Sequence, residues 1–375
     1  MELKFFADDE STHDLCVKYW ERESESYFKW TLAELAQEFS LSNKKIHDKV
    51  NSNCRAISND IKCNTCDVPY MFYSRQNFMR TELKADWVCM GCIDEANERL
   101  EQKKIKTISD SLVHSLNSPL LLDKLTARES ILLLALVRFS ATESLSDIEE
   151  LETNQTDNFT PTDNYTLDII QEMYRSNLIA IAPNSNLDAI ELAEDGKFRF
   201  NLKSVRWALP LSPDCSTLNF ITKLEERISS MEYIESDYDS IVLICREVSL
   251  AECFAFLDHV VLEHNMAFNP GNKTSLVFNK AIENFSVSQI YNFIWRAGKD
   301  AAAFYQRSGT SKKHAANTII SNIDRQLERA LSENWDIKPF KRNYNIPQST
   351  ISRVIFNTLL HTNDGGFNNT LNKVI

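Results

Sequence analysis

The amino-acid sequence predicts a mainly helical protein with small β elements. Two observations carry this prediction. From Ser216 onward apolar residues recur at three- and four-residue spacing almost throughout, which is the pattern of amphipathic and buried helices. Short segments with alternating apolar residues lie within 67–87 and 190–202, and they predict a few short strands. Because single cores rarely serve chains as long as 375 residues, we also expect several domains.

The composition predicts a folded protein in a reducing compartment. Hydrophobic residues make up 43% and charged residues 25% of the chain, and no apolar run approaches the length of a membrane span. The N-terminus has no basic head followed by an apolar core, so we expect no signal peptide, a cytoplasmic location and no membrane partner. Structural disulfides are not expected there. Five scattered cysteines are predicted to be small buried residues: Cys16, Cys54, Cys215, Cys245 and Cys253.

The other four cysteines form two Cys-x-x-Cys pairs with 22 residues between them. Such pairs could be redox dithiols, disulfides or one metal site. A thioredoxin-like site needs one pair at a helix start and has no role for a second pair. Two pairs can instead close a tetrahedral site of four thiolates, which structural zinc prefers. The sequence therefore predicts one Zn²⁺ bound by Cys63, Cys66, Cys89 and Cys92.

The segment between the two pairs is rich in aromatic residues with polar ones between them, and we expect it to form two or three short strands. Residues 62–106 thus resemble a zinc ribbon with a following helix. Zinc ribbons serve as nucleic-acid readers, protein adaptors and structural staples. The aromatic residues Phe72, Phe78 and Trp87 could form a small core or a surface on which bases stack. The cations Arg75, Arg80 and Lys84 are predicted to contact phosphates.

Residues 1–61 contain a predicted helix pair. Thr31 can cap a first helix, a turn follows at 40–42, and a second helix is expected from Asn43 to Val50 with Ile46 and Val50 inward. This pattern resembles a helix-turn-helix. The alternative is an ordinary helical hairpin with a solvated lysine face. The resemblance implies phosphate contacts by Lys44, Lys45 and Lys49 and base contacts by Asn43 and His47.

Residues 107–212 are predicted to be winged-helix-like. Thr126 begins a capping box in front of a very apolar helix, a second helix follows Thr160, and alternation around the Asp195–Gly196 turn predicts a hairpin. Two helices followed by a hairpin is the order of a winged helix. Both helices are acidic, so we expect this middle region to contact protein partners rather than DNA.

Residues 213–375 are predicted to form a helical C-terminal domain. Within it, the segment 345–356 is similar to the recognition helix of the lactose-repressor family, in which a serine turn precedes a helix that lies in the major groove. This resemblance implies DNA contacts by Gln348, Thr350 and Arg353.

Charge is distributed unevenly along the chain. The formal net charge is −12, yet residues 43–106 carry 12 Lys and Arg against 9 Asp and Glu. Residues 296–353 carry 11 basic against 5 acidic residues. Two positive segments on a negative chain would orient a polyanion and exclude it elsewhere.

Catalytic patterns are scarce. The histidines form no His-x-x-x-His pattern, there is no glycine-rich phosphate loop, and the chain has only seven glycines. Dispersed carboxylates of a metal-dependent nuclease would leave no sequence pattern, so a nucleic-acid-processing effector is one hypothesis. We expect no enzymatic activity.

The function that these observations favour is sequence-specific or structure-specific DNA binding, as in a bacterial transcription regulator, with a homodimer as an expected assembly. The alternative is a zinc-ribbon adaptor subunit of a phage-defence or mobile-element complex. Affinity for duplex DNA that falls steeply with salt would separate the two hypotheses.

Overall fold

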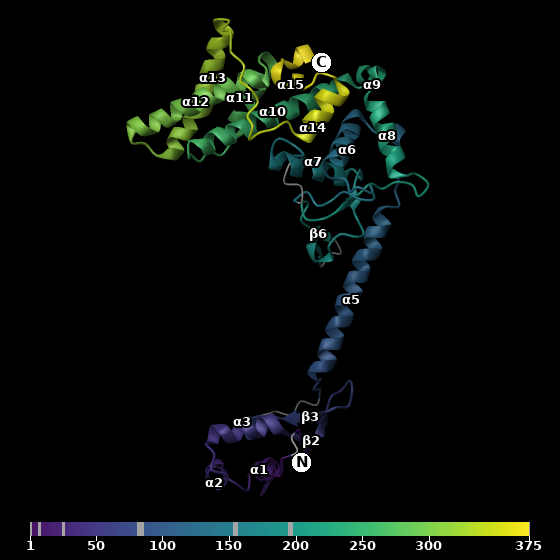
Figure 1. Ribbon diagram of the computed structural model, residues 1–375, viewed down its shortest axis with the longest axis vertical. Coiled ribbons are helices and arrows are strands. Elements are labelled where there is room, and N and C mark those ends of the chain that lie inside the picture. Colours follow the sequence, from purple (N-terminus) through teal and green to yellow (C-terminus); the bar gives the residue numbers. More distant parts are fainter. Residues whose placement is uncertain are drawn as a thin grey trace. The chain divides into compact units, whose positions relative to one another are not determined.

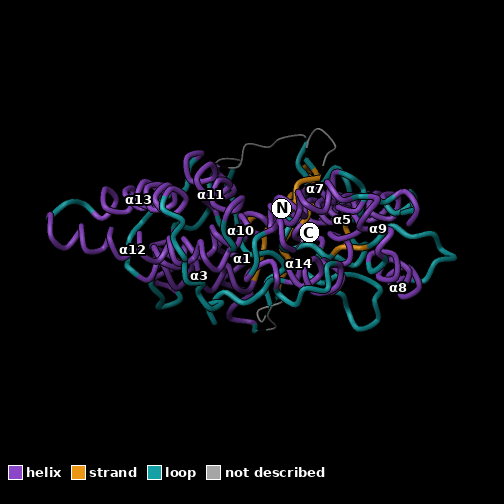
Figure 2. The backbone as a smooth tube through the Cα atoms, turned by 90° about the horizontal axis from the view of Figure 1, so that it is seen from above, coloured by secondary structure: helices purple, strands orange, loops and turns teal. Residues whose placement is uncertain are grey.

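The computed structural model describes residues 2–6, 9–24, 27–80, 86–152, 157–193 and 198–374. It confirms a mainly helical protein with small sheets, as Figure 1 and the few orange strands of Figure 2 show. The chain divides into two compact units, Met1–Ile105 and Lys106–Ile375. Among the described helices, none combines the length and the apolarity needed to cross a lipid bilayer.

In its described residues, the first unit contains short helices that pack on a three-stranded antiparallel sheet. The strand order is β1-β2-β3, with Ala56 of β2 opposite Leu3 of β1 and Phe72 of β3. The elements in chain order are β1 (Glu2–Phe5), α1 (Glu10–Trp20), α2 (Leu32–Glu38), α3 (Asn43–Asn53), β2 (Cys54–Lys62), β3 (Pro69–Phe72), α4 (Arg75–Arg80) and the start of α5 (Met90–Ser115).

The core of this unit lies between the helices and the sheet. Leu15 and Tyr19 of α1, Leu35 of α2, and Ile46 and Val50 of α3 are buried together in it. The inward positions predicted for α3 are therefore confirmed, and the face of α3 opposite them is left for solvent.

The strands predicted between the two cysteine pairs are wrong in the described part of that segment. Only β3 lies there, and it pairs with β2, which precedes the first cysteine pair. Helix α4 follows directly, and residues 81–85 lie outside the described residues. The aromatic residues after β3 alternate less strictly than a strand requires, and one of them, Phe78, packs against Phe72 from α4.

The second unit has one hydrophobic core. The buried helix α6 contacts α8, α10 and the C-terminal segment, so helices from both sides of the boundary predicted near residue 212 share that core. The elements are η1 (Leu122–Lys124), α6 (Ala127–Ser140), α7 (Asp163–Arg175), β4 (Ala180–Ile181), η2 (Leu187–Ala189), β5 (Ile190–Leu192), β6 (Phe198–Phe200), β7 (Trp207–Ala208), α8 (Thr217–Ile228), α9 (Met231–Ser236), α10 (Tyr238–Glu263), α11 (Asn272–Asn284), α12 (Val287–Ser308), α13 (Lys312–Ser332), α14 (Thr350–Ser352), the π-helix η3 (Arg353–Leu359), α15 (Gly365–Asn368) and α16 (Leu371–Val374).

The helices and the hairpin predicted for the middle region are present. Thr126 and Glu129 form the predicted capping box of α6, and β5 pairs with β6 with Ile190 opposite Phe200. The predicted turn at Asp195 and Gly196 lies outside the described residues. Whether these elements act as a winged helix stays a prediction.

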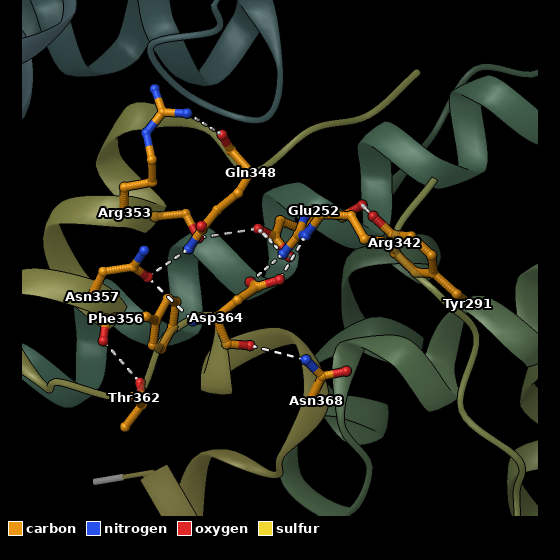
Figure 3. Close-up of polar contacts among 11 residues, drawn as sticks. Glu252, Tyr291, Arg342, Gln348, Arg353, Phe356, Asn357, Thr362, Asp364 and Asn368 are labelled. Atoms are coloured by element: carbon orange, nitrogen blue, oxygen red, sulfur yellow. Dashed lines mark hydrogen bonds and ion pairs between the residues drawn. The ribbon is translucent and has the colours of Figure 1, made fainter. Parts of the chain in front are cut away.

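The C-terminal segment is fixed to the helical core by a buried charge network, shown in Figure 3. Arg342 donates to both carboxylate oxygens of Glu252 on α10, each at 3.2 Å, and to both oxygens of Asp364 at 3.0 and 2.7 Å. The Glu252 side chain is only 4% exposed, and the guanidinium of Arg342 also lies 4.3 Å from the ring centroid of Phe367. The segment from Arg342 onward is thus joined to the centre of the bundle.

Candidate metal centre and nucleic-acid interface

The first cysteine pair lies in the turn that joins β2 to β3. The backbone N–H of Cys63 donates to the carbonyl of Val68 at 2.9 Å, and that of Asp67 donates to the carbonyl of Cys63 at 3.0 Å. Asp67 has a φ of 59°, which lets the chain reverse within a few residues. This tight turn brings the sulfurs of Cys63 and Cys66 to the same side.

The second pair lies at the start of α5. Cys89 precedes the first residue of the helix, and Cys92 belongs to its first turn. Two hydrogen bonds join the turns: Asn64 N–H to the Trp87 carbonyl at 3.0 Å and Cys89 N–H to the sulfur of Cys63 at 3.3 Å. Backbone contacts therefore hold the two pairs together.

The four sulfurs form a compact group. The ligand atoms of Cys63, Cys66, Cys89 and Cys92 all lie within 4.8 Å of one another, and the sulfurs of Cys66 and Cys89 are 3.6 Å apart. All four are free cysteines. Thiolates that bind Zn²⁺ at about 2.3 Å in a tetrahedron lie about 3.8 Å from one another. The arrangement is compatible with a metal site, as the sequence predicted.

Electrostatics favour thiolates here but oppose placing four of them together. The Cys89 N–H lowers the pKa of Cys63 to about 6, with help from the N–H of Thr65. The sulfurs of Cys66 and Cys89 raise the pKa of Cys92 well above its usual value. A divalent cation would remove this conflict because it stabilises every thiolate that it binds.

The aromatic residues beside the cysteines form a small core. Phe72 is buried, and Phe78 and Trp87 pack against the same cluster. The ring centroids of Phe72 and Phe78 are 4.9 Å apart in an edge-to-face contact. Of the two roles left open by the sequence, the structure favours the core over a surface for stacked bases.

The helix pair α2–α3 is joined by a short, well-defined turn. Thr31 accepts a hydrogen bond from Glu34 N–H, and the Glu34 carboxylate accepts one from Thr31 N–H, which is the predicted cap extended to a full capping box. Ser40 has a φ of 54°, and Ser42 caps α3 by accepting from the N–H of Lys45. The helices therefore meet in a fixed geometry.

The left-handed backbone of Ser40 predicts a stabilising substitution. A non-glycine residue pays a steric penalty in this conformation, so Ser40→Gly is expected to raise the free energy of unfolding by about 0.5 to 1 kcal/mol. Slower hydrogen exchange at the amides of α2 and α3 would measure this gain in stability. In the control, Ser52→Gly inside α3 should lower stability by about 0.5 kcal/mol. Unchanged or faster exchange in Ser40→Gly would contradict the prediction.

The residues predicted to contact DNA from α3 differ in their availability. Asn43, Lys44 and Lys45 are exposed in the first turn of α3. His47 is half-buried, and its Nδ1 lies 3.0 Å from the Tyr19 hydroxyl, so its ring is held by α1. Lys49 is half-buried. The exposed part of the predicted surface is therefore the N-terminal turn of the helix.

Arg75 has a structural role, which corrects its predicted contact with phosphate. Its guanidinium donates to the backbone carbonyls of Tyr19 at 2.5 Å and Trp30 at 2.6 Å, and it lies 4.5 Å from the ring centroids of both Tyr19 and Phe28. Burial lowers the pKa of Arg75 to about 10, so it stays charged at neutral pH. Its donors are used inside the unit, where they fix α4 to α1.

The structure describes only one of the two other cations that were predicted to contact phosphates from the ribbon segment. Arg80 is exposed at the end of α4. Lys84 lies outside the described residues.

The stretch similar to a lactose-repressor recognition helix is mostly buried, and its polar side chains contact the second unit, which overturns the contacts predicted for it. Thr350 is 3% exposed, and its N–H donates to the carbonyl of Asn158. Gln348 donates to Ser352 and Asn357, and Arg353 pairs with Asp157 at 2.8 Å (Figure 3 shows Gln348 and Arg353). The local sequence matches a recognition helix, but the apolar residues around it pack into the core of the second unit.

The remaining cysteines mostly follow the prediction. Cys16, Cys54, Cys245 and Cys253 are buried, whereas Cys215, just before α8, is partly exposed.

Comparison of the chain with family models, with curated proteins and with solved structures found no match.

Sequence reasoning missed Tyr19 as an organising residue of the first unit. Its hydroxyl meets His47 and the N–H of Arg75, and its carbonyl accepts from the Arg75 side chain. These contacts join α1, α3 and α4, which lie far apart in the sequence. A tyrosine in an amphipathic helix gives no local signal of such partners.

Proposed function

We propose that the protein binds DNA through its first unit, as a bacterial transcription regulator would, and that the four cysteines hold one structural Zn²⁺. The observation that carries the proposal is the exposed N-terminal turn of α3. Asn43, Lys44 and Lys45 lie there at the positive end of the helix dipole, which suits contact with phosphates and base edges. No ion pair is recorded for these lysines among the described residues.

The order of elements supports the proposal. The helix pair α2–α3 is followed by the hairpin β2–β3, so the combination expected in the middle of the chain also occurs in the first unit. Ile46 and Val50 hold α3 by one face, and the opposite face is free for a groove. This is how a helix-turn-helix presents its second helix to DNA.

The zinc ion would have a structural role and not a catalytic one. The cysteine centre joins the tip of the β2–β3 hairpin to the start of α5, and a small unit gains folding free energy from such coordination. Four sulfur donors suit Zn²⁺ better than Mg²⁺ or Ca²⁺, which prefer oxygen. The ion would thereby fix the hairpin that follows α3.

Reversing two charges tests the proposal. The variant Lys44→Glu/Lys45→Glu is expected to bind duplex DNA about 100-fold more weakly than the wild type at about 50 mM salt, because two phosphate contacts become repulsive. Fluorescence anisotropy with a labelled duplex would measure this. Zinc content should stay unchanged, since neither lysine contacts the cysteine centre.

A matched variant separates a local effect from a change in total charge. Lys4→Glu/Lys104→Glu makes the same charge change in the same unit, at two exposed positions outside α3, and should retain most of the affinity. Equal affinity of the α3 variant and the wild type would discard the placement of DNA on α3.

One observation favours the adaptor as a second candidate. Between the cysteine centre and residue 105, helix α5 exposes apolar side chains: Ile93 is 39%, Leu100 58% and Ile105 41% exposed. A protein partner could cover them. If the wild type fails to retain duplex DNA even at low salt, the adaptor hypothesis gains.

A further inference from the structure

Helix α12 carries a row of cations on one face. Arg296, Lys299 and Arg307 are three, then eight, residues apart, so they project from nearly the same side of the helix. All three are exposed. The opposite face is fixed in the core of the second unit, because Ile290, Ile294 and neighbouring residues are buried there. The helix therefore cannot rotate to hide its charges.

The row continues around the end of the helix. Gly309, with a φ of 63°, ends α12, and Ser311 caps α13 by accepting from the N–H of His314. Lys312 and Lys313 occupy the first turn of α13 and are exposed. We name Arg296, Lys299, Arg307, Lys312 and Lys313 the basic row.

Few acidic residues accompany these cations. Residues 301–323 contain no Asp or Glu, although the chain has 53 of them, and Asp300 is the one acidic residue between 296 and 323. No ion pair is recorded for any member of the basic row within the described residues. Elsewhere in the second unit cations such as Arg128, Arg138 and Arg206 pair with carboxylates at 2.6 to 3.1 Å.

Some members of the row are held in place without losing charge. The Nζ atom of Lys299 lies 4.3 Å from the ring centroid of Trp295, and Nε of Arg307 donates to the Ala303 carbonyl at 3.2 Å. Within the described residues no other contact engages the remaining donors of either group, so they are available to an anion. A cation that is partly fixed loses less entropy when it binds a ligand.

We propose that the basic row binds the phosphate backbone of DNA, as a contact surface separate from α3. This inference rests on the proposed function and adds a second surface to it. The part of the row on α12 spans about 16 Å at 1.5 Å per residue, a length over which a strand of DNA presents several phosphates. An otherwise acidic chain would direct the polyanion to such places.

The experiment removes the charge of each side chain and leaves a polar side chain in its place. Arg296→Gln/Lys299→Gln/Arg307→Gln is compared with Lys124→Gln/Arg175→Gln/Lys223→Gln, in which the same number of exposed cations is neutralised at other sites of the second unit. The affinity of each full-length protein for a duplex of about 30 base pairs is measured over a range of salt concentrations. The α3 variant is measured beside them.

The expected result is a salt dependence that is shallower by about 3 in the slope of log K against log salt for the row variant, and by less than about 1 for the matched control. Equal slopes for the row variant and the control would overturn the proposal and leave the row a solvated surface. Failure of α3 as the DNA contact would show separately, as an unchanged affinity of the α3 variant. Absence of any DNA binding by the wild type would overturn both.

Discussion

Replacing Cys89 with serine is expected to abolish tight metal binding and to unfold the first unit. Three thiolates with one hydroxyl bind Zn²⁺ far more weakly than four thiolates, and structural zinc sites in small modules supply about 10 to 16 kcal/mol of apparent binding free energy. Cys89 also donates its N–H to Cys63, so the change falls at the junction of both turns. The metal content measured by elemental analysis should fall from one ion per chain to none.

Hydrogen exchange would report the structural part of this result. Amides of α1, α2 and α3 should lose protection in Cys89→Ser, whereas those of α10 and α12 should keep it, because the second unit has its own core. The matched control is Cys215→Ser, which leaves the four-cysteine centre intact and should retain one ion per chain. A Cys89→Ser protein with full metal content and a protected first unit would contradict the proposal that the four cysteines bind one structural ion.

Replacing Arg342 with methionine is expected to destabilise the second unit by about 3 to 5 kcal/mol, because the change leaves Glu252 buried without a compensating charge. Desolvation already raises the pKa of Glu252 even with Arg342 beside it. Asp364, which is held by the same guanidinium, would lose its partner too. Urea unfolding followed by circular dichroism would measure the loss, together with faster exchange at amides of the C-terminal segment.

An exposed ion pair supplies the control for Arg342. Arg246 pairs with Glu283 at 3.3 Å, and their side chains are 39% and 54% exposed. Arg246→Met is therefore expected to cost less than about 1 kcal/mol. If both variants lost the same small amount of stability, the buried network would not be what fixes the C-terminal segment.

Local patterns in the sequence predicted those features whose physical cause is also local. Thr31 and Thr126 were identified as helix caps because a cap acts within a few residues along the chain. Spacing alone indicated that the four cysteines could share an ion, since each pair occupies one turn. The inward positions Ile46 and Val50 followed from helical periodicity.

Features that depend on distant partners could not be predicted in this way. Arg75 looked like a free cation, but the carbonyls that it binds belong to α1 and to a loop more than 40 residues earlier. The residues of 348–353 matched a recognition helix because a polar helix on the surface and a buried helix can share the same few letters. In both places tertiary packing decided the outcome.

The burial of most cysteines outside the four-cysteine group has a consequence for fluorescence labelling. Burial raises the pKa of Cys245 to about 12 and also raises the pKa of Cys253 well above its usual value. Cys16 and Cys54 are enclosed in the first unit, so these four thiols would react slowly with a maleimide dye. An ion bound by the other four would shield them as well. Cys215, partly exposed before α8, would then accept a single fluorophore in the unmodified chain, and each further equivalent of dye taken up would report a cysteine released from the metal.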